Sequence, residues 1–218
     1  MNFFATKVVH RISFAFFLAS CFFCYVECNS QGKPGTGDLA KGRGENNFLM
    51  VLNTTEPLYL YCWSVNGSEE CNRTVESCIV DTGACEHIRK TALTTMQYNF
   101  TNSFLTSDHK WTNESYMGNF VTSAEPPTEM NVTNITAGST GNWDVQLRYN
   151  QPDTYNCSVV TIKDRTSNAP MMCAMYIRGD LPNGTYPPVS CQEDYDTHCP
   201  SAIIYKSYMW NCSSYQGQ

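Results

Sequence analysis

The chain has 218 residues, with 14 Lys and Arg against 20 Asp and Glu, and its formal net charge is −6 at pH 7. This balance disfavours nucleic acid as a partner, because binding to phosphates requires a basic face. The 12 cysteines instead make the redox environment of the chain the first question.

The N-terminus has the pattern of a signal peptide. Lys7 and Arg11 precede an apolar run from Ile12 to Tyr25, and residues 1–28 are the predicted signal peptide. A membrane anchor is the alternative, but about 14 apolar residues fall short of the roughly 20 that span a bilayer. The sequence therefore predicts a secreted, extracellular protein that is not held in a membrane, and its mature chain keeps an acidic charge.

The mature chain retains nine cysteines, which is an odd number. In an oxidising compartment this predicts up to four disulfides and one remaining thiol, either buried or open to an intermolecular bridge. A zinc site is the alternative, but the predicted mature chain has no Cys-x-x-Cys pair and its histidines are scattered, so we expect no metal and no cofactor. The nine are Cys62, Cys71, Cys78, Cys85, Cys157, Cys173, Cys191, Cys199 and Cys212.

Glycosylation sequons are dense and support secretion independently. Two further matches, Asn156 and Asn211, have a cysteine as the middle residue, whose disulfide can form before a glycan is added. The sequence thus predicts a glycoprotein. The predicted acceptors are Asn53, Asn66, Asn72, Asn99, Asn113, Asn131, Asn134 and Asn183.

The chain divides into three parts. After the signal peptide, residues 29–46 are rich in Gly, Ser, Lys and Asn with few apolar side chains, which predicts a disordered leader. Residues 47–218 form one predicted domain, because about 165 residues are enough for a single core and no second linker interrupts them.

Within this domain the hydrophobic period is mostly two, which indicates strands. The exceptions are a predicted short helix at residues 48–52 and a helix from Ser190 to Cys199, with Ser190 as N-cap and Glu193 at the capping-box position. Residues 205–210 are a possible last strand. The seven principal strands are predicted at residues 58–65, 92–100, 111–121, 130–135, 143–149, 157–162 and 172–177.

This pattern predicts a mostly β fold, either a closed up-and-down barrel or a two-sheet sandwich. An immunoglobulin-like sandwich requires Cys, Trp and Cys in a set order, and neither Trp111 nor Trp143 falls between a suitable pair. The favoured fold is an eight-stranded antiparallel barrel. Its interior leaves room for side chains or for one small ligand.

The order of several short motifs resembles the salivary lipocalins of hard ticks, the histamine-binding protein family, over essentially the whole mature chain. The region from Cys62 to Cys85 departs from that family, since it holds four cysteines where such lipocalins show one or two; an extra bridge from Cys71 to Cys85 is a hypothesis. The motifs are Glu56-Pro57-Leu58-Tyr59-Leu60-Tyr61, Pro126 to Val132, Tyr155 to Val160, Cys173-Ala174-Met175-Tyr176-Ile177, Cys191 to Cys199 and Tyr208 to Cys212.

The resemblance implies a lipocalin-like barrel closed at one end, with one helix packed outside and disulfides as staples. Closing loops of more than a hundred residues stabilises the fold by about 4–5 kcal/mol in the chain-entropy model. The implied bridges are Cys78 to Cys212, and bonds from Cys157 or Cys173 to the helix cysteines Cys191 and Cys199. The implied function is capture of a host mediator of inflammation or haemostasis at the feeding site, in evasion of the host immune response.

Members that bind biogenic amines such as histamine share a motif with two acids, and this chain keeps its spacing without them. The frame is reproduced by three elements with fourteen residues between each and the next: Cys157-Ser158-Val159, Ala174-Met175-Tyr176 and Cys191. Ser158 and Ala174 stand where the acids are expected. Because a buried ammonium requires a carboxylate or an aromatic face, the sequence favours an eicosanoid or another amphipathic ligand over an amine.

Other residues could still supply a charge or a cation-binding aromatic wall. Glu129, Asp153, Trp63 and Trp210 belong to this wider set, although solvated acids and core aromatics are the commoner roles. Asp144 follows Trp143 directly, so the two face opposite ways on a strand. The candidate ligand contacts are Trp111, Trp143, Asp144, Tyr149 and Tyr176.

Catalysis finds no support, because no histidine lies in a recognisable nucleophile or general-base motif and no phosphate loop is present. The first hypothesis is therefore a monomeric lipocalin that sequesters a small-molecule host mediator, an amine or an eicosanoid. The alternative is a protein-binding lipocalin with a filled barrel, whose loops engage a complement or immune protein. Dense glycosylation slightly disfavours that alternative.

Overall fold

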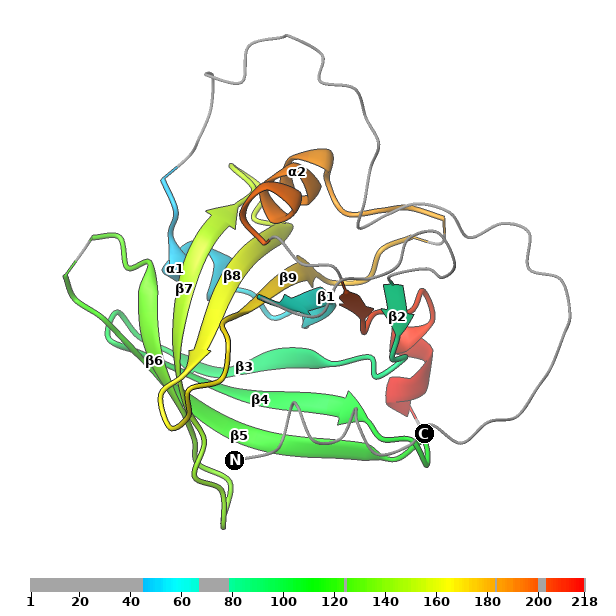
Figure 1. The fold of residues 1–218 in the computed structure, drawn as a ribbon, viewed down its shortest axis with the longest axis horizontal. Coiled ribbons are helices and arrows are strands. Elements are labelled where there is room, and N and C mark those ends of the chain that lie inside the picture. The colour runs from blue at the N-terminus through cyan, green and yellow to red at the C-terminus, as the bar shows by residue number, and fades with distance from the viewer. Residues whose placement is uncertain (1–44, 67–78, 124, 183, 200–202, 218) are drawn as a thin grey trace, which may run out of the picture.

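The computed structural model describes residues 45–66, 79–123, 125–182, 184–199 and 203–217, and it is mostly β (Figure 1). The predicted signal peptide and nearly all of the predicted leader lie outside these residues. The helices are α1 (Phe48–Leu52), α2 (Val189–His198) and the 3-10 helix η1 (Cys212–Gly217). The strands are β1 (Leu58–Val65), β2 (Ile79–Asp81), β3 (His87–Leu93), β4 (Gln97–Leu105), β5 (Trp111–Phe120), β6 (Glu129–Asn134), β7 (Asn142–Asn150), β8 (Cys157–Asp164), β9 (Met172–Arg178) and β10 (Ile204–Lys206).

The strands form a closed antiparallel barrel. Strands β3 to β9 pair in chain order, and β1 closes the ring by pairing with both β3 and β9. The short strands β10 and β2 extend the sheet outside the ring, with β10 antiparallel to β1 and β2 parallel to β10. The eight-stranded lipocalin-like barrel expected from the sequence is confirmed.

Inward and outward side chains alternate along the barrel strands, as the pleat requires. On β4, Tyr98, Phe100 and Asn102 are buried, while the residues between them are partly exposed. Apolar inward residues from the strands and α1 together make one buried cluster inside the barrel. Strand β1 differs, because seven of its eight residues are buried.

The full burial of β1 arises because both of its faces are covered. Its register against β9 shifts between Leu60 and Cys62, which marks a β-bulge. Leu60 and Trp63 therefore both belong to the interior cluster, whereas Tyr61 and Cys62 belong to a second cluster outside the barrel. The bulge thus returns Trp63 to the interior.

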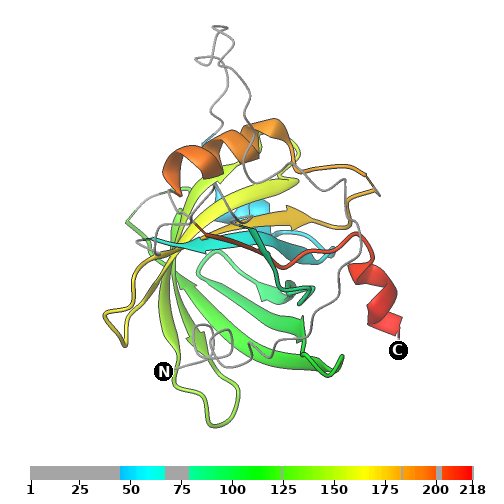
Figure 2. The same ribbon diagram turned by 45° about the vertical axis from the view of Figure 1, so that its right-hand side comes forward.

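The second cluster lies between the outer wall, α2 and the C-terminal segment. Figure 2 shows α2 lying across the outer face of strands β7, β8 and β9. Disulfides Cys157–Cys191 and Cys173–Cys199 tie this helix to β8 and β9, and both are of the kind that the family resemblance implied. Cys62, on β1, is a completely buried thiol.

The expected bridge from Cys78 to Cys212 is wrong, because Cys212 is joined to Cys85. The suggested bridge from Cys71 to Cys85 is wrong for the same reason. Backbone bonds explain the pairing: the Cys85 amide donates to the Ser207 carbonyl at 3.0 Å, so the C-terminal segment runs beside this cysteine. Cys71 and Cys78 lie outside the described residues.

Two element predictions require correction. The strand expected at residues 92–100 contains a turn between β3 and β4, where the Thr94 hydroxyl accepts from the backbone amides of Met96 and Gln97. Ser190 is not the N-cap of α2, which begins at Val189 after Pro188 and has no side-chain cap. The other predicted strands and the short helix at Phe48–Leu52 are present, with small shifts at their ends.

Helix α1 closes one end of the barrel. Its buried residues Phe48, Val51 and Leu52 join the interior cluster. The helix is held at both ends: the Asn47 side chain accepts from the Met50 amide, and the Arg178 guanidinium donates to the carbonyls of Met50 and Val51, both at 3.0 Å. Among the described residues no helix is long and apolar enough to cross a membrane.

We expect Arg178→Met to loosen this closed end. Three hydrogen bonds from a charged donor are lost, two to α1 and one of 3.4 Å to the Thr154 carbonyl. Each is of the kind that contributes about 1.5–3 kcal/mol, so the melting temperature should fall by roughly 10 °C or more. Thermal unfolding followed by circular dichroism measures the change. Arg148→Met is the control, because Arg148 is exposed and its guanidinium hydrogen-bonds only Gln146 among the described residues; equal losses in both variants would contradict the role assigned to Arg178.

Candidate ligand-binding site

The barrel encloses a cavity of about 890 Å³. This volume lies within the range of about 300–1,000 Å³ that is usual for small-molecule sites. At one end the cavity is closed by α1, and at the other it is lined by the β6–β7 loop at residues 138–141 and the β8–β9 loop at residues 166–170. The loop end is the mouth of the barrel.

Most of the cavity wall is apolar or aromatic. Phe100 stacks on Tyr98 and on Tyr116, with ring centroids 4.9 and 5.2 Å apart, and Tyr116 lies 5.8 Å from Trp143. The strand residues that supply the apolar part of the wall are Leu58, Leu60, Val65, Ile88, Phe100, Met130, Val132, Val145, Val160, Ile162 and Met172. The barrel is therefore suited to a largely apolar ligand.

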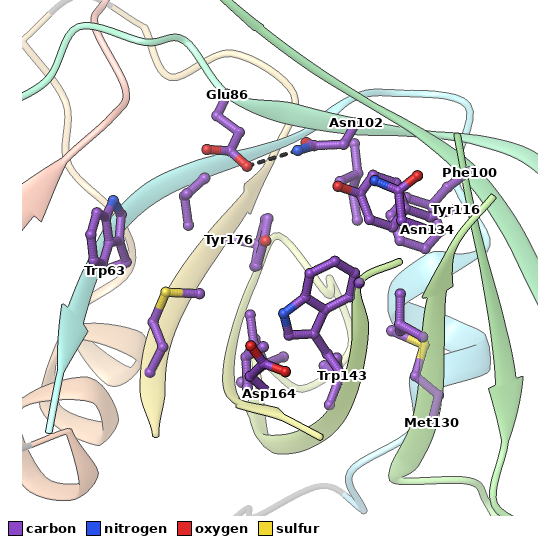
Figure 3. A pocket seen from close by; sticks show the side chains of 18 of the residues that line it. Trp63, Glu86, Phe100, Asn102, Tyr116, Met130, Asn134, Trp143, Asp164 and Tyr176 are labelled. Atoms are coloured by element: carbon purple, nitrogen blue, oxygen red, sulfur yellow. Dashed lines mark hydrogen bonds between the residues drawn. The ribbon is translucent and has the colours of Figure 1, made fainter. Parts of the chain in front are cut away.

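One carboxylate, that of Glu86, faces this apolar space at mid-depth. The residue immediately precedes β3, and its side chain points into the cavity beside Tyr176 (Figure 3). Its Oε1 accepts a hydrogen bond of 2.8 Å from the Asn102 side-chain amide. Among the described residues no hydrogen bond reaches Oε2, so this oxygen is open to a ligand.

The backbone fixes Glu86 firmly. Its amide donates to the Ser207 hydroxyl at 3.1 Å, and its carbonyl accepts from the Leu60 amide at 2.8 Å. The preceding residue, Cys85, is bridged to Cys212. The C-terminal segment outside the barrel thus holds the acid that points inward.

A further acid, Glu114, shares the inward phase of Tyr116 on β5 but does not line the cavity. Its Oε2 accepts from the Tyr116 hydroxyl at 2.6 Å and from the Asn134 amide at 3.2 Å. Tyr116 and Asn134 both line the cavity. Two polar lining groups are therefore turned toward Glu114, while its negative charge adds to that of Glu86.

Burial dominates the electrostatics of the site. Enclosure raises the pKa of Glu86 from 4.5 to about 7, the Asn102 hydrogen bond opposes this, and Glu114 adds a smaller increase. Burial also raises the pKa of the Tyr176 hydroxyl, with the charge of Glu86 as a further cause. At neutral pH Glu86 is therefore poised between its two protonation states.

Besides Glu86, the cavity lining contains the acid Asp164, which lies at the mouth. Its carboxylate accepts from the Thr166 amide at 2.7 Å and from the hydroxyls of Thr166 and Ser167 at 2.6 and 2.9 Å, and these bonds hold its pKa below the usual range. Asp164 is thus occupied in building the loop. Among the described residues, the charged groups that line the cavity are Glu86 and Asp164, both acidic.

The predicted ligand contacts divide into two groups. Trp143 and Tyr176 line the cavity, so ligand contact stays a prediction for them. Trp111, Asp144 and Tyr149 do not, and for these the expectation is wrong. Trp111 packs on His87 and Tyr149 on the outer cluster, while Asp144 is paired with Arg165 at the surface, 3.4 Å away.

Strand alternation gives the physical reason for this division. Asp144 and Trp143 face opposite sides, as adjacent strand residues must, and it is Trp143 that faces inward. Of the wider set, Trp63 lines the cavity, whereas Glu129 is exposed and accepts from Gln146. Asp153 is also exposed, and Trp210 is 65% exposed.

The two positions where the amine motif carries acids also face inward here. Ser158 lines the cavity and Ala174 belongs to the interior cluster. The sequence reasoning missed Glu86, Asn102 and Glu114. Asn102 and Glu114 carry a visible signal, since they continue the inward phase set by Phe100 and Tyr116 on their strands.

Comparison with known proteins finds only distant structural likenesses. No family model and no curated protein sequence matches the chain. Lobster apocrustacyanin A1 aligns with a TM-score of 0.46 and 10% identity, over 71% of this chain and 77% of that one. Japanin from Rhipicephalus appendiculatus, bound to cholesterol, gives 0.43 and 13% over 69% and 91%. The amine-binding protein of Rhodnius prolixus, in its tryptamine complex, gives 0.41 and 14% over 66% and 70%.

These neighbours are lipocalin-fold proteins. Likenesses this distant carry no argument about the ligand of this chain, which has to come from its own residues.

Of the predicted glycan acceptors, Asn134 is unsuitable in the folded protein. It is 7% exposed and lines the cavity, and its side chain donates to Glu114 and accepts from the Thr136 amide. We expect peptide mapping of secreted protein to find Asn134 unmodified, and exposed acceptors such as Asn53 and Asn113 occupied. A glycan on Asn134 in correctly folded protein would contradict the inward placement of this residue.

We expect Glu86→Gln to change the pH dependence of stability. Because folding raises the pKa of Glu86, the folded protein binds this proton more tightly than the unfolded chain, so stability is lost as the pH rises from 4.5 through about 7. The loss is on the order of 3 kcal/mol. The neutral glutamine avoids it, and should raise the melting temperature by roughly 5–10 °C at pH 8, with little change at pH 4.5.

The control is Glu129→Gln, which makes the same charge change at an exposed position. Melting curves at pH 4.5 and pH 8 for both variants and the native chain provide the measurement. If Glu86→Gln and Glu129→Gln responded alike at pH 8, Glu86 would not be an enclosed acid.

Proposed function

We propose that this protein is secreted and sequesters a small organic molecule inside its barrel. The observation that carries the proposal is the cavity of about 890 Å³, enclosed by apolar and aromatic side chains with a few polar groups among them. Binding sites for small molecules have this composition, because apolar walls supply affinity and a few polar groups supply orientation. Nothing in the proposal requires a chemical step, so we regard the protein as a binding protein and not as an enzyme.

The disulfides support an extracellular role. Cys85–Cys212, Cys157–Cys191 and Cys173–Cys199 form and persist in oxidising compartments. Together with the predicted signal peptide and the resemblance to salivary lipocalins of ticks, they favour capture of a host mediator of inflammation or haemostasis, acting as a monomer in evasion of host defence. The source of the chain and the identity of the mediator belong to the proposal.

The chemistry of the wall revises the preferred ligand. The sequence favoured an eicosanoid, because Ser158 and Ala174 replace the acids of the amine motif. Glu86 nevertheless places a carboxylate in the cavity, and no Lys, Arg or His is among the described lining residues. An anionic head group would therefore meet charge of its own sign. The wall is better suited to an amphipathic ligand with a neutral or positive head.

The alternative function, a protein-binding lipocalin, assumed a barrel filled by its own side chains. The cavity volume does not favour that assumption. Engagement of a host complement or immune protein through the loops has no feature among the described residues in its favour, and we retain it only as an outcome of the binding experiment.

The proposal is tested by tryptophan fluorescence. Trp63 and Trp143 line the cavity, so a bound ligand should change their emission. Delipidated and refolded native protein is titrated with histamine, serotonin, leukotrienes and arachidonate in parallel. The variant Ser158→Phe is titrated with the same four ligands. Ser158 is buried on the cavity wall, and an added ring there should weaken binding by roughly tenfold or more.

The control is Thr91→Phe, which adds the same ring at an exposed position on β3 and leaves every sequon intact. Both variants are checked for native circular dichroism before titration. Saturable quenching that Ser158→Phe weakens and Thr91→Phe leaves unchanged would support binding in the cavity. No saturable response to any ligand, combined with capture of a plasma protein by the native chain, would favour the protein-binding alternative.

A further inference from the structure

We propose that the cavity takes a single-chain amphiphile with a primary ammonium head, which binds at Glu86 with its alkyl chain along the apolar wall toward α1. This inference rests on the proposed function, since it names the ligand class of the same cavity. It differs from both small amines and anionic lipids, and it follows from three features of the interior.

The first feature is a set of acceptors without donors. Glu86 Oε2 accepts no hydrogen bond from the described residues, and Asn102 Oδ1, in a side chain only 5% exposed, likewise has no partner among them. The side-chain amide of Asn102 donates to Glu86, and the side-chain oxygen of Asn102 is left without a hydrogen-bond partner. Because buried polar groups are normally paired, this arrangement calls for a donor. An ammonium group carries three N–H donors and no acceptor.

The second feature is the sign of the enclosed charge. Both charged residues among the described lining, Glu86 and Asp164, are acidic. Asp164 is saturated by Thr166 and Ser167 of its own loop, so it leaves Glu86 as the available partner. Glu114 accepts hydrogen bonds from Tyr116 and Asn134, and it adds negative potential although it does not line the cavity. A cation is therefore favoured and a carboxylate head is opposed.

The third feature is the apolar space on the closed side of Glu86. Along β4, the lining residue Phe100 follows Asn102 toward α1, a distance of about 7 Å at 3.3 Å per residue. Leu58, Val51 and Phe48 continue the wall there. The whole cavity of about 890 Å³ corresponds to roughly 30 water molecules at about 30 Å³ each. A small amine alone would leave most of this apolar surface uncovered, whereas an alkyl chain covers it.

The test separates head group from chain length. The native protein is titrated with butylamine, octylamine and dodecylamine below their micelle concentrations, and with dodecanol and laurate as neutral and anionic partners of the same chain length. Affinity for the amines should rise by roughly fourfold per added methylene until the closed end is filled. Dodecylamine should bind at least tenfold more tightly than dodecanol, and laurate more weakly than either.

Variants then assign the two ends of the ligand. Glu86→Gln should weaken dodecylamine binding by roughly 10- to 100-fold and leave dodecanol within twofold, whereas Glu129→Gln, at the exposed outer position, should change neither. Val51→Phe narrows the closed end and should weaken dodecylamine more than butylamine. The chain-length series in the native protein tests the same point should Val51→Phe fail to fold.

The outcomes are distinct. Equal binding of dodecylamine, dodecanol and laurate, unaffected by Glu86→Gln, would overturn the ammonium site but leave the proposed small-molecule function standing. Butylamine binding as tightly as dodecylamine would overturn the placement of the chain. If none of the five compounds binds and the mediators titrated above do not bind either, the proposed function itself fails.

Discussion

The pairing of β1 with β9 is the constraint on which the rest of the structure depends. It turns an open sheet into a ring, so no barrel strand keeps an unpaired edge and the inward side chains are largely shielded from bulk water. Enclosure gives the apolar wall its affinity for a ligand and also places Glu86 in surroundings of low polarity. The ring closes only because β1 bulges between Leu60 and Cys62, which keeps Trp63 inside while Tyr61 and Cys62 both face outward.

The cluster outside the barrel controls the site inside it. Helix α2 is fixed to β8 and β9 by two disulfides, and the C-terminal segment is fixed to the start of β3 by Cys85–Cys212. Ser207 in that segment accepts from the amide of Glu86. The acid is therefore held by a part of the chain more than a hundred residues away, and its direction depends on packing that no ligand touches. An inward-facing acid held this rigidly has little freedom to turn away from the cavity.

Much of the fold was predictable because most strands display their phase openly. Residues 111–120 alternate cleanly once Tyr116 and Phe120 are taken as inward, and that phase already places Trp111 outside, where the structure has it. The turn between β3 and β4 was hidden because Thr94 builds it with its hydroxyl, without the Gly, Pro or Asn that usually mark a turn. Trp143 and Tyr176 could be found from alternation and from the motif frame. Glu86 could not, since its inward direction depends on Ser207 and on the Cys85–Cys212 disulfide, for which the family resemblance implied Cys78 instead.

An enclosed acid that destabilises the fold requires a physical reason to be tolerated. Folding raises the pKa of Glu86 to about 7, so the empty barrel is least stable where the carboxylate is charged. A bound cation reverses this relation, because it stabilises the charged form and lowers the pKa of its partner. Binding and deprotonation of Glu86 are therefore linked: affinity for a cation rises as the pH increases through 7, and part of the stability lost by the empty barrel returns in the complex. On this argument the unfavourable burial of Glu86 and its capacity to select a cationic ligand are two consequences of the same closed ring of strands.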